Sequence, residues 1–526
     1  MKAILVILCL LFPLSVLAQD AVTPYVATAE DLEIEDGVLN DFIYSGEGDD
    51  PEWVVIPEDL GIVEIADFGF HKDKREKKAT LKRVSLPHSV KRIGPDAFSF
   101  CRLTQVDLNP EIEFIGYCAF QDNKLVEVSL PPSLKQCGLN AFTCGSLTKI
   151  NWHESPNCPI DVLSGFACDT NLRYIEIPSY VKALGYDAFR NVCPDSIKLN
   201  EGLDSISGAF FNDRLSYDGS KLKKVEFPNS LRYIDHVAFA ANTALESIKF
   251  GEGLTMIGYG CFTYNISLQS VAFPENLTYI GTRAFKDCIK LRSVAFNSKL
   301  TEIGYQAFRH CPELYDYRLP DGLEKLGVEA FRGTAIADLR IPGGIKVVPK
   351  QCFSYCTYKK GAKITFAEGV EEIADSAFYN YVRITESSTF TDSVTLSLPS
   401  TLRRIGNSAF EMVWVRQTPL PQVDENGGRL KWQAYLRGEL EVDDVKYIGG
   451  YMATGFQRAG LYEYIAKPRE DDDPQTLKPV TPGNHVVNTE YFSLSGVRTS
   501  APSKGVNIVR RTYSDGSVVT EKTLVK

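Results

Sequence analysis

One arrangement of apolar residues recurs along most of the chain with a period of about 23 residues. Each copy ends in an Ala-Phe pair or a close variant, and nine of the fourteen intervals between successive repeat phenylalanines are 22 or 23 residues. A fixed period of this length is typical of repeat proteins, whose units bury their apolar faces only against neighbouring units. The copy that ends at Phe285 has apolar residues at Leu268, Val271, Phe273, Leu277, Ile280 and Ala284.

Each copy predicts one strand and one turn. Val271 and Phe273 have the two-residue spacing of a strand with one buried face, and Pro274 ends that strand because it cannot donate a ladder hydrogen bond. Gly281 allows the backbone to turn where a side chain would collide. We expect Ala284-Phe285 to form a short helical turn. The predicted fold is an α/β repeat, a solenoid with one short strand plus a turn or short helix in each of about fifteen units.

The repeat phenylalanines are the predicted core, because a column of large apolar side chains can pack along the axis of a solenoid. Variants of the Ala-Phe ending supply further members at Phe70, Phe166, Phe211 and Phe353. The predicted core residues are Phe98, Phe120, Phe142, Phe189, Phe239, Phe262, Phe285, Phe308, Phe331, Phe378 and Phe410.

Most cysteines fall at fixed positions of the repeat. Cys101, Cys288, Cys311 and Cys356 follow the repeat phenylalanine by three residues, a position that is asparagine in other copies (Asn123, Asn242 and Asn265). Both residue types are small and can satisfy a nearby backbone group, so we expect buried thiols there. A disulfide is possible only in the irregular stretch that contains Cys137, Cys144, Cys158, Cys168 and Cys193, and its pairing cannot be derived from the sequence.

Residues that flank the buried strand residue should point outward and form two columns along one face of the array. We interpret these columns as the candidate binding surface, with Tyr174, Arg318 and Arg340 as its anchors, since tyrosine and arginine dominate interfaces. A solvated sheet face without a ligand is the alternative interpretation. The candidate binding residues are Arg83, Asp107, Glu127, Tyr174, Glu176, Lys198, Lys224, Glu226, Lys249, Asp316, Arg318, Asp338 and Arg340.

The ends of the chain differ from the repeat. Lys2 followed by the apolar run to Phe12 and the small residues before Gln19 predicts a signal peptide over residues 1–18, and therefore export to the cell surface or the medium. The predicted organisation continues with an N-terminal capping unit (19–57), the repeats (58–425), a C-terminal cap (426–468), a polar linker (469–484) and a β tail (485–526). No later stretch is apolar for long enough to predict a transmembrane helix.

The composition and motifs argue against catalysis and against nucleic acid. A net charge of −10 would repel a phosphate backbone. The six histidines show no metal-ligand spacing, and the pair Cys352 and Cys356 lacks the second pair that a zinc site needs. His310 beside Cys311 is the nearest approach to a nucleophile with its base. We therefore predict no enzyme activity, no metal and no cofactor.

The period, the strand that ends in proline and the Ala-Phe-x-x-Cys ending together resemble the BspA-type leucine-rich repeats of bacterial surface proteins, over about residues 32–425. The β tail resembles C-terminal sorting segments of the type IX secretion route; a small β module without a sorting role is the alternative. The resemblance implies a leucine-rich-repeat solenoid, and we expect a monomer. It also implies adhesion to host matrix, host cells or other bacteria, with protein or glycan ligands. The alternative is a spacer of the cell envelope. The interruptions at 71–78, 151–165 and 379–395 are candidate specificity loops.

Overall fold

The computed structural model describes residues 23–45, 51–70, 81–154, 156–208, 210, 221–380, 394–399, 401–406 and 409–410, and short strands beyond Phe410. The chain forms two compact units, Met1–Ala466 and Lys467–Lys526. The predicted signal peptide lies outside the described residues, and so do the polar linker and all but the short strands of the C-terminal cap. Among the described residues, no helix is long and apolar enough to cross a membrane.

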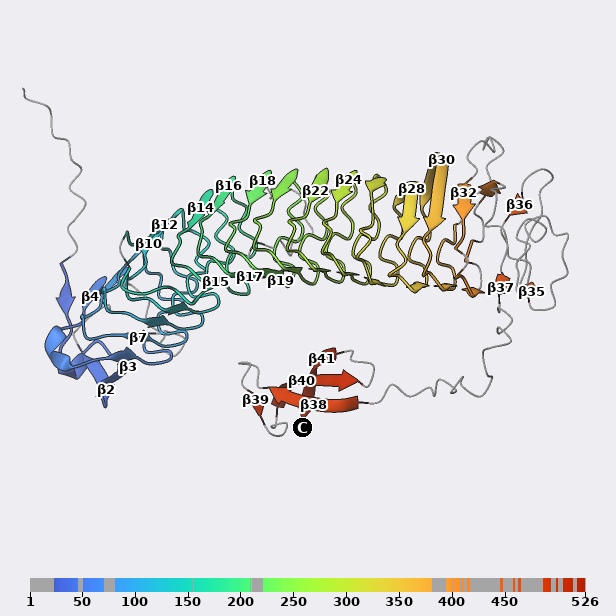
Figure 1. The fold of residues 1–526 in the computed structure, drawn as a ribbon. Helices are drawn as coiled ribbons and strands as arrows, with labels where there is room; N and C mark the ends of the chain where they lie inside the picture. Colours follow the sequence, from blue (N-terminus) through green and yellow to red (C-terminus); the bar gives the residue numbers. More distant parts are fainter. Residues whose placement is uncertain are drawn as a thin grey trace, which may run out of the picture. The chain divides into compact units, whose positions relative to one another are not determined.

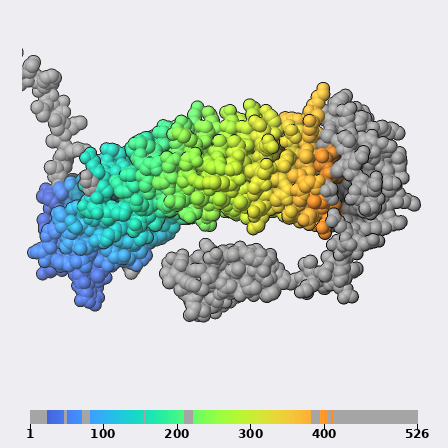
Figure 2. Space-filling model, in the orientation of Figure 1, coloured from blue at the N-terminus to red at the C-terminus, as the bar shows by residue number. Residues whose placement is uncertain are grey.

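The first unit is a solenoid whose coils each contribute two strands, one to each of two parallel sheets on opposite sides of the array (Figure 1). The first sheet is interrupted and the second sheet is nearly continuous. Figure 2 shows the coils as one continuous surface coloured in chain order, because each coil packs on the coils next to it. The sequence predicted only the first strand of each coil.

The first sheet contains the strands that the sequence predicted. Its ladders are in register, so that Val271 lies opposite Val294 and both are buried. Its strands are β1 (Tyr25–Val26), β4 (Trp53–Val55), β6 (Arg83–Ser85), β8 (Gln105–Asp107), β10 (Glu127–Ser129), β12 (Lys149–Asn151), β14 (Tyr174–Ile177), β16 (Ser196–Leu199), β18 (Lys224–Glu226), β20 (Ser247–Lys249), β22 (Ser270–Ala272), β24 (Ser293–Ala295), β26 (Asp316–Tyr317), β28 (Ala335–Ile341), β30 (Thr357–Phe366), β32 (Val394–Ser397) and β34 (Trp414–Arg416).

The second sheet is built from strands of two or three residues in most coils, and its inward residue is usually isoleucine or leucine. Its first two strands form an antiparallel hairpin at the N-terminal end. Its strands are β2 (Leu32–Glu35), β3 (Val38–Phe42), β5 (Glu64–Ile65), β7 (Arg92–Ile93), β9 (Phe114–Ile115), β11 (Gln136–Cys137), β13 (Val162–Leu163), β15 (Ala183–Leu184), β17 (Ser205–Ser207), β19 (Tyr233–Asp235), β21 (Met256–Ile257), β23 (Tyr279–Ile280), β25 (Glu302–Ile303), β27 (Lys325–Leu326), β29 (Val347–Val348), β31 (Glu372–Ile373) and β33 (Arg404–Ile405).

A ladder of stacked phenylalanine rings runs through the array from Phe42 to Phe410, with ring centroids of neighbouring coils 4.7 to 5.8 Å apart. Every predicted core phenylalanine is buried in this ladder. The predicted member Phe211 lies outside the described residues, and Phe210 is the ring that stacks between Phe189 and Phe239. Phe42, in the N-terminal hairpin, extends the ladder beyond the repeats recognised in the sequence.

The Ala-Phe segment is a turn and not a helix, which corrects the predicted α/β class to a β-solenoid. Arg283 and Asp287, which flank Phe285 by two residues on each side, have φ values of 57° and 60°. A helix cannot continue through such left-handed residues. The backbone amide of Phe285 instead donates to the carbonyl of Ala307 in the next coil (2.7 Å). The only helices of the described residues are two 3-10 segments, η1 (Ala29–Asp31) and η2 (Glu58–Leu60).

Glycine is required where successive coils approach most closely. A Cβ atom on Gly281 would lie 2.6 Å from the carbonyl carbon of Gly258 in the preceding coil. The equivalent glycines of other coils, such as Gly304, face the same restriction. The sequence-based expectation that a side chain would collide here is confirmed, and the collision is with the backbone of the neighbouring coil.

The shared cysteine and asparagine position stabilises a carbonyl next to the phenylalanine ladder. The thiol of Cys288 donates to the carbonyl oxygen of Phe262 (3.2 Å), and Asn265 Nδ2 donates to that of Phe239 (3.0 Å). Both residues therefore perform one task, which is to satisfy a buried acceptor in the preceding coil. All twelve described cysteines are thiols, including the five of the irregular stretch. Burial raises the pKa of the Cys288 thiol well above its usual range.

A buried carboxylate ties the N-terminal end of the array together. Asp31 accepts hydrogen bonds from the Tyr25 hydroxyl (2.6 Å), from the amide and hydroxyl of Thr28 (2.8 and 2.9 Å), and from the amide and hydroxyl of Ser45 (2.9 and 2.7 Å). Burial alone would raise the pKa of Asp31, but these donors, led by Tyr25 and Ser45, lower it well below its usual range. Asp31 is thus ionised in the folded protein at neutral pH.

The second unit, taken by itself, is one antiparallel sheet of order β39-β38-β40-β41. The sequence predicted three short strands in this tail, and the structure has four. They are β38 (Val486–Phe492), β39 (Arg498–Thr499), β40 (Gly505–Tyr513) and β41 (Val518–Val525). Three more short strands of the first unit lie within the predicted C-terminal cap: β35 (Val445–Tyr447), β36 (Gln457–Arg458) and β37 (Tyr462–Tyr464).

We expect Phe285→Ala to lower the free energy of unfolding by about 3–5 kcal/mol, because it leaves a cavity between the rings of Phe262 and Phe308. Urea denaturation measures this change. Ser270→Ala, at an exposed position of β22 in the same coil, is the control and should change stability by less than about 0.5 kcal/mol. Equal stability of the two variants would contradict the ladder as the core.

Candidate interaction surface

The predicted binding residues lie where the sequence placed them, on the outer face of the first sheet. Glu176 lies opposite Lys198, Glu226 opposite Lys249, and Asp338 opposite Lys363 on adjacent strands. The remaining predicted residues occupy the same sheet, with Arg318 one residue beyond the end of β26. The two columns of outward side chains that strand alternation predicts are therefore present in the structure.

Most of these side chains bind one another. Lys198 Nζ lies 2.6 Å from Glu176 Oε1, and the Tyr174 hydroxyl donates to Glu176 Oε2 at 3.0 Å. The hydrogen bonds from Lys198 and Asn200 lower the pKa of Glu176 to about 2. Charges that neutralise each other along a solvated sheet leave little that is free to attract a partner.

The same holds for two of the predicted arginines. Arg83 Nη2 lies 2.6 Å from Asp107 Oδ2, and its guanidinium stacks 4.0 Å from the centre of the Trp53 ring. Arg340 forms an ion pair with Asp321. An arginine that already has a carboxylate partner contributes less to an interface than a free one, because that contact must first be given up.

Aromatic side chains gather instead on the outer face of the second sheet and on the turn that follows it. This surface contains six tyrosines. Five of them have 39 to 52% of their surface exposed, and the sixth, Tyr279, is half-buried. Sequence reasoning missed this surface because it did not expect the second strand. We call this set the tyrosine face: Tyr117, Tyr186, Tyr233, Tyr259, Tyr279 and Tyr305.

A hollow of about 490 Å³ lies on the C-terminal part of the tyrosine face and spans β23, β25, β27 and β29. Tyr279 and Tyr305 contribute to its aromatic lining. Glu302 and Lys325 on neighbouring strands also line it and pair at 3.5 Å. The hollow is open, and its lining combines apolar and polar residues.

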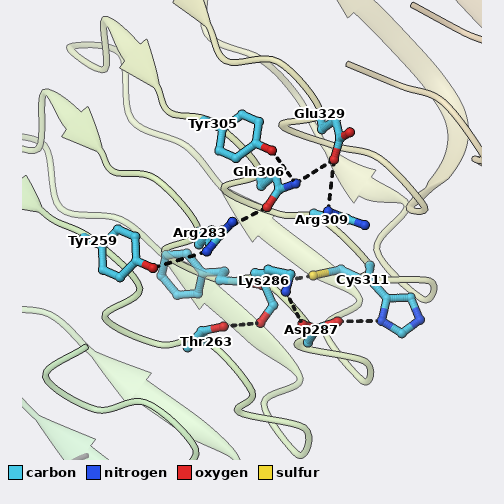
Figure 3. A network of polar contacts seen from close by, with 12 residues as sticks. Tyr259, Thr263, Arg283, Lys286, Asp287, Tyr305, Gln306, Arg309, Cys311 and Glu329 are labelled. Atoms are coloured by element: carbon cyan, nitrogen blue, oxygen red, sulfur yellow. Dashed lines mark hydrogen bonds and ion pairs between the residues drawn. The ribbon is translucent and has the colours of Figure 1, made fainter. Parts of the chain in front are cut away.

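A polar network holds the tyrosines beside this hollow in place (Figure 3). Arg283 donates from Nη1 to the Tyr259 hydroxyl oxygen (3.3 Å) and from Nε to Gln306 Oε1 (2.9 Å). Gln306 Nε2 donates to the Tyr305 hydroxyl oxygen (2.8 Å) and to Glu329 Oε2 (2.7 Å). These residues come from four successive coils, so the network runs along the direction in which the coils stack.

The network ends on a buried carboxylate. Glu329 also lies 2.7 Å from Arg332 Nη1 and 3.1 Å from Arg309 Nη1. Burial acts to raise the pKa of Glu329, but the hydrogen bond from Gln306 and the two arginines outweigh it and lower the pKa. A satisfied buried network of this kind rigidifies the surface above it, which reduces the entropy lost when a partner binds.

His310 and Cys311 do not form a nucleophile with its base. The fully buried thiol of Cys311 donates to the Phe285 carbonyl at 3.2 Å, and burial raises its pKa well above the usual range. His310 Nδ1 lies 2.6 Å from Asp287 Oδ1, and Lys286 Nζ lies 3.1 Å from Asp287 Oδ2. Over the described part of the chain, no three His, Cys, Asp or Glu side chains are grouped to hold a metal ion.

Comparison with known families agrees with the repeat geometry. The profile of the BspA type leucine-rich repeat region matches six copies, over residues 73–159, 163–292 and 282–411, which is more than half of the chain. The chain belongs to the BspA-type leucine-rich repeat family. Membership of this family suggests a role in protein interaction, and repeat proteins of this class are typically binding scaffolds without enzyme activity.

Several solved leucine-rich repeat proteins are similar to this member of the BspA-type family. One from Bacteroides ovatus is 22% identical, and the match covers 65% of this chain and 97% of that one (TM-score 0.37). The pneumococcal vaccine antigen PcpA is 20% identical, over 70% and 91% (TM-score 0.40). A leucine-rich cell surface protein from Faecalibacterium prausnitzii is 20% identical, over 69% and 96% (TM-score 0.33). No curated protein matches the chain.

We expect Gln306→Ala to lower the free energy of unfolding by about 1–3 kcal/mol, because Gln306 is buried and its loss leaves Glu329 Oε2 and Arg283 each without one partner. Thermal or urea denaturation measures the loss. Thr301→Ala is the control, since its exposed hydroxyl donates only to the carbonyl of Thr278. A loss no larger than that of the control would show that the network does not stabilise this face.

Proposed function

We propose that the chain is an exported, non-enzymatic adhesin that contacts extracellular proteins of a host or of neighbouring bacteria through the tyrosine face. The observation that carries the proposal is the pair Tyr259 and Tyr305, which are exposed and yet held by Arg283 and Gln306. Tyrosine is enriched among the residues that dominate binding energy, and a fixed ring loses little freedom when a partner binds.

A spacer of the cell envelope is the second candidate. It is favoured by the first sheet, where the charges at Glu176 and Glu226 are neutralised by lysines on adjacent strands. A surface of this kind gives solubility without a ligand. The two candidates differ in whether substitutions on the tyrosine face change adhesion.

Binding to immobilised matrix proteins, bacterial cells and glycans tests the proposal with the chain that begins at residue 19. We expect the triple variant Tyr259→Ala, Tyr279→Ala and Tyr305→Ala to weaken binding to a protein ligand at least about tenfold, equivalent to ~1.4 kcal/mol. The control is Tyr174→Ala, which removes a tyrosine of 55% exposure from the first sheet. Urea denaturation of both variants separates lost binding from lost folding.

Three results would contradict this function. Equal binding by the triple variant and by Tyr174→Ala would exclude the tyrosine face. Selective binding to glycans would replace the protein ligand by a carbohydrate. The absence of any ligand above background would favour the spacer.

We also propose that residues 1–18 direct export and that the tail over residues 485–526 is a sorting segment that brings the array to the cell surface. Support comes from the apolar run at the N-terminus and from the resemblance of the tail to such segments. Cell fractionation with surface proteolysis tests both steps. We expect the full chain to be cleaved by external protease, and a chain without residues 485–526 to be exported but protected.

A further inference from the structure

Several described coils have another residue at the position that links each coil to the one before it, and in one of them that residue is an acid. Three residues after the ladder phenylalanine, most coils have a cysteine or an asparagine that donates to a phenylalanine carbonyl, as Asn123 Nδ2 does to Phe98 (2.8 Å) and to Phe120 (2.9 Å). In the coil of Phe166 this position is Asp169. An ionised aspartate has no hydrogen to donate.

Asp169 occupies the same place as the asparagine of other coils. The amide of Leu103 donates to Asn123 Oδ1 (2.8 Å), and the amide of Leu147, five residues after its own ladder phenylalanine, donates to Asp169 Oδ1 (3.2 Å). The planar carboxyl group therefore puts Oδ2 where the asparagine has its donating nitrogen. Asp169 is completely buried, and Oδ2 has no hydrogen-bond partner.

We propose that Asp169 makes this coil a pH-sensitive joint of the solenoid. When it takes a proton from the solvent, the neutral carboxyl group donates from Oδ2 to a phenylalanine carbonyl as asparagine does, and the coil is closed. When the proton returns to the solvent, a buried carboxylate is left whose Oδ2 has no hydrogen-bond partner, and the coil loosens.

The electrostatics agree with the geometry. Burial raises the pKa of Asp169 to about 7, although the backbone amides of the preceding coil, from Cys144 to Leu147, act to lower it. Cys144 on that coil is neutral at this pH, because burial raises its own pKa above the usual range. On the following coil, Asn191 approaches the neighbouring Cys168 at 4.0 Å and is uncharged. The group thus changes its charge near neutral pH.

The joint coincides with one of the four breaks between the described strands of the first sheet. Strand β12 pairs only with β10, and β14 only with β16, so no first-sheet ladder joins the coils on either side of residues 152–173. Across this stretch, the coils are held by the second sheet, the phenylalanine ladder and the bridge between Ile160 and Val181. A coil with one ladder fewer is held less strongly than a coil with two, so an added free-energy cost opens it more readily.

The sign of the pH dependence follows from the direction of the shift. The unfolded chain has an ordinary aspartate with a pKa of about 3.9. The protonated carboxyl group of Asp169 contributes to the free energy of unfolding, and this contribution is complete below the unfolded pKa. It is lost as the pH rises through the folded pKa. The unfolding constant should increase about tenfold per pH unit between pH ~5 and ~7 and then level off.

Asp169→Asn is the decisive variant, because it restores the residue found at Asn123, Asn242 and Asn265. Urea denaturation of the full chain at pH 5, 6, 7 and 8 gives the ratio of the unfolding constants of the native protein and the variant. Hydrogen exchange of residues 142–172, compared between the two proteins at equal pH, reports the local opening. Asn123→Asp is the reciprocal variant and should acquire the same dependence in its own coil.

We expect the native protein to lose stability and amide protection relative to Asp169→Asn as the pH rises from 5 to 7. A ratio that does not change with pH would overturn the proposal, and so would faster exchange confined to coils far from residue 169. If Asn123→Asp does not fold, the comparison with Asp169→Asn still decides. The result is independent of ligand binding, so it does not depend on the adhesin proposal.

Discussion

Stacking of one phenylalanine ring per coil is the constraint on which the rest of the structure depends. The ring spacing of 4.7 to 5.8 Å includes the distance between neighbouring strands in a sheet, about 4.8 Å, so ring stacking and strand pairing require the same rise per coil. At that rise no Cβ fits at Gly281, and the carbonyl beside each ring needs a donor from the next coil. Glycine, cysteine and asparagine therefore repeat with the phenylalanine.

The parts of the fold that follow from periodicity could be predicted, and the parts set by single backbone conformations could not. The strand at Val271 has an alternating pattern, whereas Tyr279–Ile280 is too short to show one. The left-handed residues of the turn around Phe285, Arg283 and Asp287, are not glycine, so the sequence does not distinguish this turn from a helical one. Phe210 and Phe211 both fit the repeat spacing, so the sequence alone does not show that Phe210 is the ring of the ladder.

The candidate surface also has features that follow from periodicity and features that do not. Strand alternation correctly put Tyr174 and Arg340 on an outer face, but it contains no information on neighbours, and both side chains bind carboxylates there. Tyr117, Tyr186, Tyr259 and Tyr305 each directly follow the repeat glycine. Aligning that position would have revealed the column. That Gln306 holds Tyr305 could not be derived, because it depends on a contact between side chains.

The thiols along the ladder have a consequence for biosynthesis. Each ladder cysteine acts as a small donor, like the asparagine that replaces it in other coils, and none of the twelve described cysteines forms a disulfide. The array can therefore assemble in reducing or oxidising surroundings without oxidant or isomerase. Its cysteines are most vulnerable before the coils close, when an exposed thiol could be oxidised or cross-linked. Rapid packing of each coil on the preceding coil would bury these thiols and protect them from oxidation.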